Sequence, residues 1–248
     1  MNKLKNGHIM PSARVEEFMQ TNWQEQDMVN QFAAHLLQVR EEERKRLANE
    51  IHDKLGQNLL ALRIDVSMLH ARTLDTHPRI NNKADTVLND LDVAIQNVRE
   101  IINHLRPPVL ELGLLASVEW KVKEFENNSK MPCSLQVNGN ESEYAAYDYC
   151  AMPVIRILQE LLTNAARHAG ASTVDVALSN ALEQLTIVVS DDGVGIHPDN
   201  PKKPNAFGLL GVREYVRMLN GEFLIGNNGK QNGTVLTVSI PCNGNQRY

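Results

Sequence analysis

The chain has 248 residues, of which 42% are hydrophobic and 22% charged, as in an ordinary folded protein. Its 25 Lys and Arg against 30 Asp and Glu give a net charge of -5, which argues against direct nucleic-acid binding. No apolar run approaches the ~18–20 residues that span a bilayer, and the three scattered cysteines form no C-x-x-C pair. We therefore expect a cytoplasmic protein with free thiols.

The first 107 residues have helical periodicity and almost no strand signal. Between Leu36 and Leu69, apolar residues recur every three or four positions, which predicts one long amphipathic helix. The polar, proline-containing stretch 73–82 predicts a turn. After it, apolar residues occupy both core positions of three heptads up to Leu105, which predicts a second helix that the two following prolines end.

Two helices joined by a short turn form an antiparallel hairpin, and its narrow apolar seams are best covered when two copies pair as a four-helix bundle. Beyond residue 107, short β-branched runs and amphipathic stretches predict a two-layer α/β sandwich. The expected strands lie at 173–178, 185–190 and 234–240, and the expected helices at about 116–127, 154–168 and 209–220. The expected fold class is therefore α+β, a helical hairpin in a homodimeric four-helix bundle followed by the sandwich.

The helix expected around residues 156–170 carries a polar line on one face. Glu160 and Asn164 lie one turn apart, and Arg167 and His168 follow on the next turn. The amide oxygen of Asn164 suits Mg²⁺, which takes hard oxygen ligands and shares a substrate's phosphates, while Arg167 and His168 suit phosphate oxygens. The alternative is a solvated polar stripe on a surface helix.

A glycine-containing turn, SDDGVGI, follows the second expected strand. Gly193 and Gly195 allow the backbone to turn sharply and to approach a ligand closely. Asp191, at the end of the strand, is placed to accept a hydrogen bond from the amino group of a base. An ordinary Asp-Gly turn is the alternative.

A second glycine-containing stretch, FGLLGVREYV, begins the last expected helix after a segment rich in Pro and Asn. Gly208, Leu209 and Gly211 lie where this loop becomes a helix, and a helix start offers free N–H groups to phosphate. The alternative is ordinary helix capping. Thr234, at the start of the last strand, is a candidate for one more polar contact.

The order of these motifs resembles that of a known fold. E-x-x-x-N on a helix, D-x-G-x-G after a strand and G-L-x-G at a helix start are similar to the N, G1 and G2 boxes of the GHKL ATP-binding fold of histidine kinases, Hsp90, type II topoisomerases and MutL. The resemblance covers about residues 151–240 and implies ATP and Mg²⁺ as cofactors, with Asn164 as the metal ligand and Asp191 reading adenine. The nucleotide-binding positions that it implies are Glu160, Asn164, Arg167, His168, Asp191, Gly193, Gly195, Gly208, Leu209, Gly211 and Thr234.

The first half of the chain carries EEERKRLANEIHDKLGQNL, residues 41–59, which closely resembles the phosphoacceptor box of sensor histidine kinases in the NarX- and DesK-like subclass. His52 follows Ile51 of the apolar stripe, about 100° further around the helix, so it should be reachable at the edge of the bundle. The resemblance implies that His52 takes the γ-phosphate of ATP and that Asp53 orients its ring and accepts its proton. It also implies that Gln57 positions water to dephosphorylate the partner regulator.

Together the two halves imply the ATP-dependent, autophosphorylating kinase of a bacterial two-component system, which is also a phosphatase of its response regulator, expected to be NarL-type. The resemblance divides the chain into a signalling helix (1–39), a dimerisation and phosphotransfer hairpin (40–107) and an ATP-binding domain (108–248). Without a sensor domain in the sequence, the chain is either a fragment of a longer receptor or senses through its N-terminal region or a partner. Two other functions stay open: a GHKL serine kinase of the anti-sigma type and a non-catalytic dimeric docking module.

The charged run 41–46 predicts a solvated helix surface. Its expected ion pairs are Glu41–Lys45 and Glu42–Arg46, four residues apart on the helix. Such exposed pairs contribute little to stability, and docking of a partner is the alternative role for this run.

Overall fold

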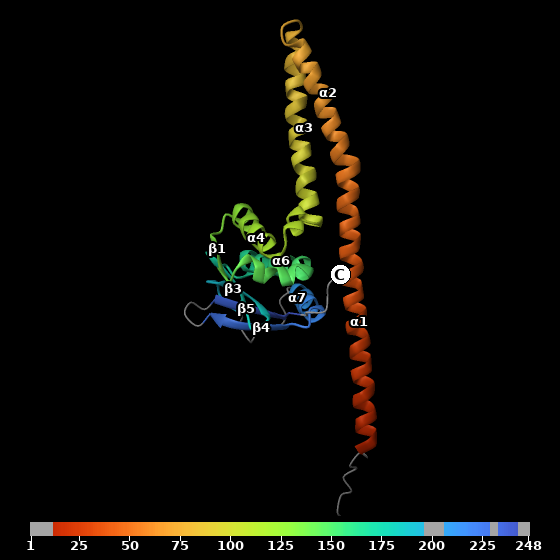
Figure 1. The fold of residues 1–248 in the computed structure, drawn as a ribbon, viewed down its shortest axis with the longest axis vertical. Helices are drawn as coiled ribbons and strands as arrows, with labels where there is room; N and C mark the ends of the chain where they lie inside the picture. The colour runs from red at the N-terminus through yellow and green to blue at the C-terminus, as the bar shows by residue number, and fades with distance from the viewer. Residues whose placement is uncertain (1–11, 196–205, 229–232, 243–248) are drawn as a thin grey trace, which may run out of the picture.

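The structure, a computed structural model, describes residues 12–195, 206–228 and 233–242. Its helical part is a long hairpin, and its mixed part is a sandwich beside that hairpin (Figure 1). The predicted α+β fold class, a helical hairpin followed by a two-layer sandwich, is confirmed, and its pairing into a dimer stays a prediction. Within the described ranges, no helix is long and apolar enough to cross a bilayer.

The hairpin begins with one very long helical segment. α1 (Ser12–Glu50) continues through a π-helical turn, η1 (Ile51–Gly56), into α2 (Gln57–Thr73), so the predicted helix is interrupted only in its hydrogen-bonding pattern. α3 (Pro78–Leu105) runs back beside it and ends at the predicted proline pair. The turn is shorter than predicted because Pro78 takes the first helical position, where its missing N–H is harmless and its fixed φ suits the helix.

Part of the apolar surface of the hairpin is left uncovered by this chain. Ala84 and Val98 of α3 are buried. On α2 and the turn before it, Leu55, Leu62 and Leu69 recur every seven residues and stay 47%, 52% and 48% exposed. A repeat of seven is the spacing at which one helix packs against another in a bundle, so this line is suited to further helices.

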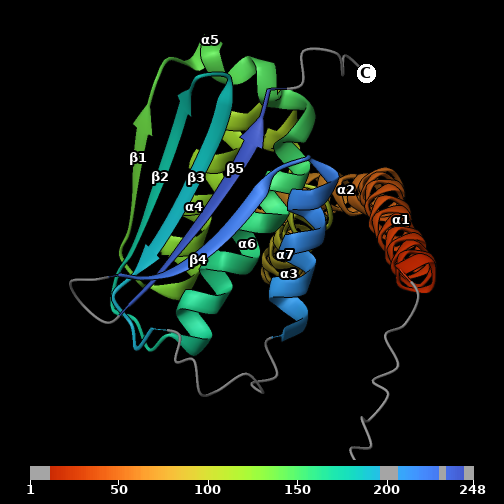
Figure 2. The ribbon, with the colours of Figure 1, turned by 90° about the horizontal axis from the view of Figure 1, so that it is seen from below.

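The sandwich has a single sheet, and helices cover one of its faces (Figure 2). The strand order is β1-β2-β3-β5-β4, with β1 parallel to β2 and the other neighbours antiparallel. The strands are β1 (Cys133–Asn138), β2 (Val174–Ala181), β3 (Gln184–Asp191), β4 (Glu222–Asn228) and β5 (Gly233–Pro241). The helices are α4 (Leu114–Ser129), α5 (Glu141–Tyr144), α6 (Ala151–His168) and α7 (Ala206–Met218), with 3₁₀ turns η2 (Pro108–Leu112) and η3 (Ala145–Cys150).

The sequence predicts β2, β3 and β5 and the helices α4, α6 and α7, each within a few residues of its observed ends. It does not predict β1 and β4, which form the two edges of the sheet. An edge strand pairs on one side only and tolerates polar residues and glycine, which weakens the apolar alternation of β4, whereas β1, with the sequence CSLQVN, alternates strictly but has only six residues. In β4, with the sequence EFLIGNN, only the Phe and the Ile are half-buried apolar residues, and none of its residues is fully buried.

α6 supplies the centre of the core. Ile157, Leu158 and Leu161 are fully buried, and they join a cluster that includes Val176 and Ile187 of the sheet. Their spacing places them on one helix face, so packing fixes how α6 is rotated. The polar motif residues of α6 lie at the half-buried edge of this face, as Glu160 and Asn164 do, and at its exposed C-terminal end.

Candidate functional site

The phosphoacceptor candidate lies in the π-helical turn η1. The side chains of His52 and Asp53 are 69% and 67% exposed, as the sequence predicts for a reachable histidine. Nδ1 of His52 lies 3.2 Å from Oδ1 of Asp53. Because a carboxylate only accepts hydrogen bonds, this pairing favours the neutral tautomer with its proton on Nδ1, in which Nε2 is the unprotonated nitrogen.

Gln57 is the first residue of α2, and its side chain is exposed. A π turn closes through i→i+5 bonds and is wider than an α turn, so Gln57 lies slightly less than one full turn beyond Asp53. Short π-helical segments inside α-helices often occur at functional sites. Asp53 and Gln57 are therefore on adjacent turns at the same exposed part of the hairpin.

The N-box candidates lie on the last turns of α6. Nδ2 of Asn164 donates to Oε1 of Glu160 at 3.4 Å, which uses one side of the amide and turns its Oδ1 the other way. Arg167 and His168, at the C-terminal end of the helix, are exposed. Within the described part of the chain, no three His, Cys, Asp or Glu side chains cluster as a metal site, so a Mg²⁺ ion beside Asn164 would need the phosphate oxygens of a nucleotide as ligands.

Asp191 is the last residue of β3, and two backbone N–H groups hold its carboxylate in place. It is 5% exposed, and its Oδ1 accepts from the N–H groups of Gly193 at 3.0 Å and Thr234 at 3.2 Å. Thr234 thus acts through its backbone, and the preceding Gly233 is required because a Cβ there would overlap the Asp191 carbonyl. With Oδ1 fixed, Oδ2 is the atom suited to an amino group of a base.

The G1 turn packs directly on the end of α6. A Cβ on Gly193 would overlap the backbone of Ala169, and the N–H of Val194 donates to the Ala169 carbonyl at 2.8 Å. Gly195 has φ = 72°, in the left-handed region that favours glycine. The glycines predicted to shape a pocket therefore let this turn approach the helix that carries Asn164.

Asp192 is a positioning residue of this turn that the sequence did not single out. Its carboxylate accepts from the N–H groups of Thr173 at 2.9 Å and Ser172 at 2.7 Å and from the Ser172 hydroxyl at 2.7 Å. The hydrogen bond from the Thr173 backbone, with those from Ser172, holds the pKa of Asp192 well below its usual range. The sequence motif marks only the first aspartate, because the partners of the second lie about twenty residues earlier.

The G2 candidates begin α7. A Cβ on Gly208 would overlap the Glu160 carboxylate, so this glycine brings the start of α7 against the N-box residues of α6. Leu209 packs at the edge of the core, whereas a Cβ on Gly211 would meet nothing within 4 Å. The expected Pro- and Asn-rich segment before Gly208 lies mostly outside the described residues. The three motifs meet where α6 ends and α7 begins (Figure 2).

The predicted ion pairs of the charged run are wrong. Glu41 bonds instead to Arg44 and to Arg156 of α6, and Glu42 accepts from Gln38. Glu41 thus contacts the sandwich through Arg156, and the spacing of charges along one helix cannot reveal such a contact.

Comparison with known proteins identifies both halves. Residues 43–110 match the family described as "Histidine kinase", and residues 151–244 match "Histidine kinase-, DNA gyrase B-, and HSP90-like ATPase". The chain is 31% identical over 217 residues to the histidine-protein kinase/phosphatase DegS of Brevibacillus brevis, covering 85% of this chain and 54% of that protein.

Two further relatives agree. The chain is 29% identical to the histidine-protein kinase/phosphatase UhpB of Salmonella typhimurium, over 95% of this chain and 45% of that protein. It is 26% identical to the nitrate/nitrite sensor protein NarX of Escherichia coli, over 81% of this chain and 33% of that protein. The chain thus spans about half or less of the length of these relatives. With its phosphoacceptor and ATPase domains in this order, the chain belongs to the histidine kinases of the NarX-like subclass that carry a GHKL ATPase domain.

Proposed function

We propose that this protein uses Mg·ATP to phosphorylate its own His52 and then passes the phosphoryl group to an aspartate of a response regulator. The observation that carries the proposal is the exposed His52, with Nδ1 paired to Asp53, in the same chain as a GHKL site. The family relationship supports the same activity, since the related DegS and UhpB are named kinase/phosphatases. We also propose the three-part division at residues 39/40 and 107/108.

The residues have distinct tasks in this reaction. Nε2 of His52 attacks the γ-phosphorus, so that an N–P bond forms while the bond to the β-phosphate oxygen breaks and ADP leaves. Asp53 holds the ring by its Nδ1 proton and stabilises the positive charge that develops on it. When bound, Mg²⁺ neutralises charge on the transferring phosphate. Asn164 would hold the metal, and Oδ2 of Asp191 would accept from the adenine amino group.

The proposed phosphatase activity uses the same exposed turn. The amide of Gln57, next to Asp53, suits the orientation of a water molecule toward a phosphorylated aspartate on the regulator. Both side chains are exposed, so a partner protein can reach them. We propose a receiver domain of the NarL type as this partner.

A second copy of the chain is the proposed partner of the hairpin. The exposed line of Leu55, Leu62 and Leu69 needs cover, and two hairpins provide it as a four-helix bundle. Homodimerisation is tested by the molar mass of the protein in solution, and a monomer at micromolar concentration would contradict it.

The decisive experiment is incubation with Mg·ATP labelled at the γ-phosphate. We expect an acid-labile, alkali-stable label on the parent, no label on His52→Gln, and full label on the control His35→Gln, which changes an exposed histidine of α1. Asp191→Asn should lose the label through weaker nucleotide binding. Label that persists in His52→Gln would overturn the proposal, nucleotide binding without label would favour a docking module, and acid-stable label on another protein would favour a serine kinase.

A further inference from the structure

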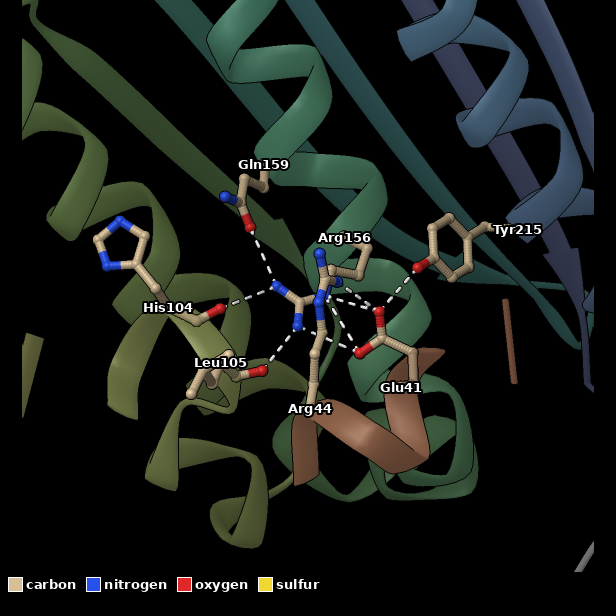
Figure 3. A network of polar contacts seen from close by, with 7 residues as sticks. All are labelled: Glu41, Arg44, His104, Leu105, Arg156, Gln159 and Tyr215. Carbon is tan, nitrogen blue, oxygen red and sulfur yellow. Dashed lines mark hydrogen bonds and ion pairs between the residues drawn. The ribbon is translucent and has the colours of Figure 1, made fainter. Parts of the chain in front are cut away.

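A polar cluster joins the sandwich to the long helix α1 (Figure 3). Nε and Nη2 of Arg156, on α6, donate to the two carboxylate oxygens of Glu41 on α1, each at 3.1 Å. The hydroxyl of Tyr215, on α7, donates to the same carboxylate at 2.8 Å. Arg44, one turn further along α1, donates to it at 2.6 Å. Glu41 therefore accepts from two helices of the sandwich as well as from its own helix.

Arg156 also binds the other helix of the hairpin. Its Nη1 and Nη2 donate to the backbone carbonyls of His104 at 3.2 Å and Leu105 at 2.7 Å. These residues form the last turn of α3, where carbonyl groups lack partners within the helix. One guanidinium from the sandwich thus caps α3 and pairs with α1, so a shift between the two helices would disturb its bonds.

The cluster is largely withdrawn from water. The side chains of Arg156 and Glu41 are 8% and 17% exposed. Burial acts to raise the pKa of Glu41, but the hydrogen bonds from Arg156 and Tyr215 and the charges of Arg156 and Arg44 together outweigh it and hold that pKa below its usual value. Leu37, one turn before Glu41, packs against the core of the sandwich. Polar and apolar contacts therefore lie side by side in one docking surface on α1.

This docking surface is separated from the phosphoacceptor. Glu41 is eleven residues before His52, about 16 Å along the helix axis. The sandwich therefore lies beside an earlier part of the helix, and it leaves the His52 side chain 69% exposed. Phosphoryl transfer requires the reacting atoms to come within about 3–3.5 Å.

The nucleotide site is also displaced from the docking surface. On α6, Asn164 lies about 12 Å beyond Arg156, and on α7 Gly208 lies about 10 Å before Tyr215. α6 and α7 lie roughly perpendicular to α1 (Figure 2). Their nucleotide-binding ends are therefore displaced away from α1 and not along it toward His52. Within one chain, the docked arrangement therefore does not bring the nucleotide site to His52.

We propose that Glu41, Arg156 and Tyr215 form a latch that holds the ATP-binding domain docked on α1, and that opening the latch raises the rate of His52 phosphorylation. These three are positioning residues, because they act by setting where the domain stands. The inference rests on the proposed autophosphorylation. Since α1 extends from the latch back to Ser12, a displacement of this helix would act on the latch directly.

The test compares Glu41→Gln and Tyr215→Phe with the control Glu43→Gln. Glu43 lies on the same helix and pairs with Arg46, but this pair is exposed and contacts only α1. We expect Glu41→Gln to raise the initial rate of His52 labelling by about 5- to 150-fold, the range of ordinary coupling between sites, with a smaller rise for Tyr215→Phe and none for the control. The affinity for nucleotide should stay unchanged, and the radius of gyration from small-angle X-ray scattering should increase.

Several outcomes would overturn the latch. An unchanged or lower labelling rate in Glu41→Gln, with nucleotide affinity intact, contradicts it, as does unchanged scattering. If circular dichroism shows that Glu41→Gln does not fold, Tyr215→Phe decides, because it removes only a hydroxyl. If neither parent nor variants take label, the proposed function fails, and the scattering of parent and variants alone decides whether the latch holds the domain.

Discussion

In the sandwich, Asp191 is 5% exposed and its Oδ1 is fixed by two backbone N–H groups, whereas in the hairpin the His52 side chain is 69% exposed and pairs with its neighbour Asp53. A residue that recognises a nucleotide must be held in place before the ligand arrives. A residue that exchanges a phosphoryl group must instead be reached in turn by a nucleotide and by a partner protein. The sandwich should therefore lose both fold and function when its site is changed, and the hairpin should lose function alone.

The largest effect is expected in the hairpin. Asp53→Asn should lower the rate of autophosphorylation by about 10²- to 10⁴-fold, because the ring loses its charged partner. The melting temperature should not change, since the Asp53 side chain is 67% exposed. Asp65→Asn, a change of an exposed aspartate on α2, is the control and should keep the parent's rate. A full rate in Asp53→Asn would show that His52 needs no carboxylate beside it.

In the sandwich, Gly193→Ala should lower the free energy of unfolding by about 1–3 kcal/mol and abolish nucleotide binding, because its Cβ overlaps the Ala169 backbone. The matched control is Gly211→Ala, where a Cβ meets nothing within 4 Å and alanine suits a helix. Urea denaturation would give both stabilities, and titration calorimetry the nucleotide affinity of Gly193→Ala. Equal stabilities for the two variants would refute the close approach of the G1 turn to α6.

The smallest effect concerns the contact between the two regions and its dependence on pH. The pKa of Glu41 is lowered when docked, so its contribution to docking is present above the ordinary value of about 4.3 and is lost as pH falls through the lower, docked value. Burial and the charge of Glu41 raise the pKa of Tyr215 to about 12, so it stays neutral.

Scattering between pH 7 and pH 3.5 measures this dependence. The radius of gyration of the parent should stay constant down to the ordinary glutamate pKa and rise only below it, because the docked pKa of Glu41 is lowered, while that of Glu41→Gln should be large throughout. Circular dichroism at each pH would separate opening from unfolding. A rise in the parent near pH 6 would instead assign the opening to a histidine.

The two regions also differ in how far the sequence predicts them. α6 is predicted because its buried residues follow the helical period, and the glycines of the G1 turn are predicted because close approach restricts the residue type. The role of Glu41 is not predicted, because its partners on the sandwich, Arg156 and Tyr215, lie more than a hundred residues away and local spacing favours other pairs. The role of Asp192 is missed for the same reason. Contacts between distant segments leave little periodic signal.

The π-helical turn sets an angle as well as exposing a histidine. Leu47, Ile51, Leu55 and Leu59 follow one another in steps of four, and in an unbroken α-helix three such steps would advance the line by about 120°. The wider π turn accommodates one extra residue, which cancels the rotation of about 100° that one residue adds in an α-helix. Leu47 and Leu59 therefore stay on the same side of the helix. If this turn became α-helical, Glu41 would swing by about that angle relative to α2. The same six residues of the π-helical turn thus set both the direction in which Glu41 points around the helix and the exposure of His52.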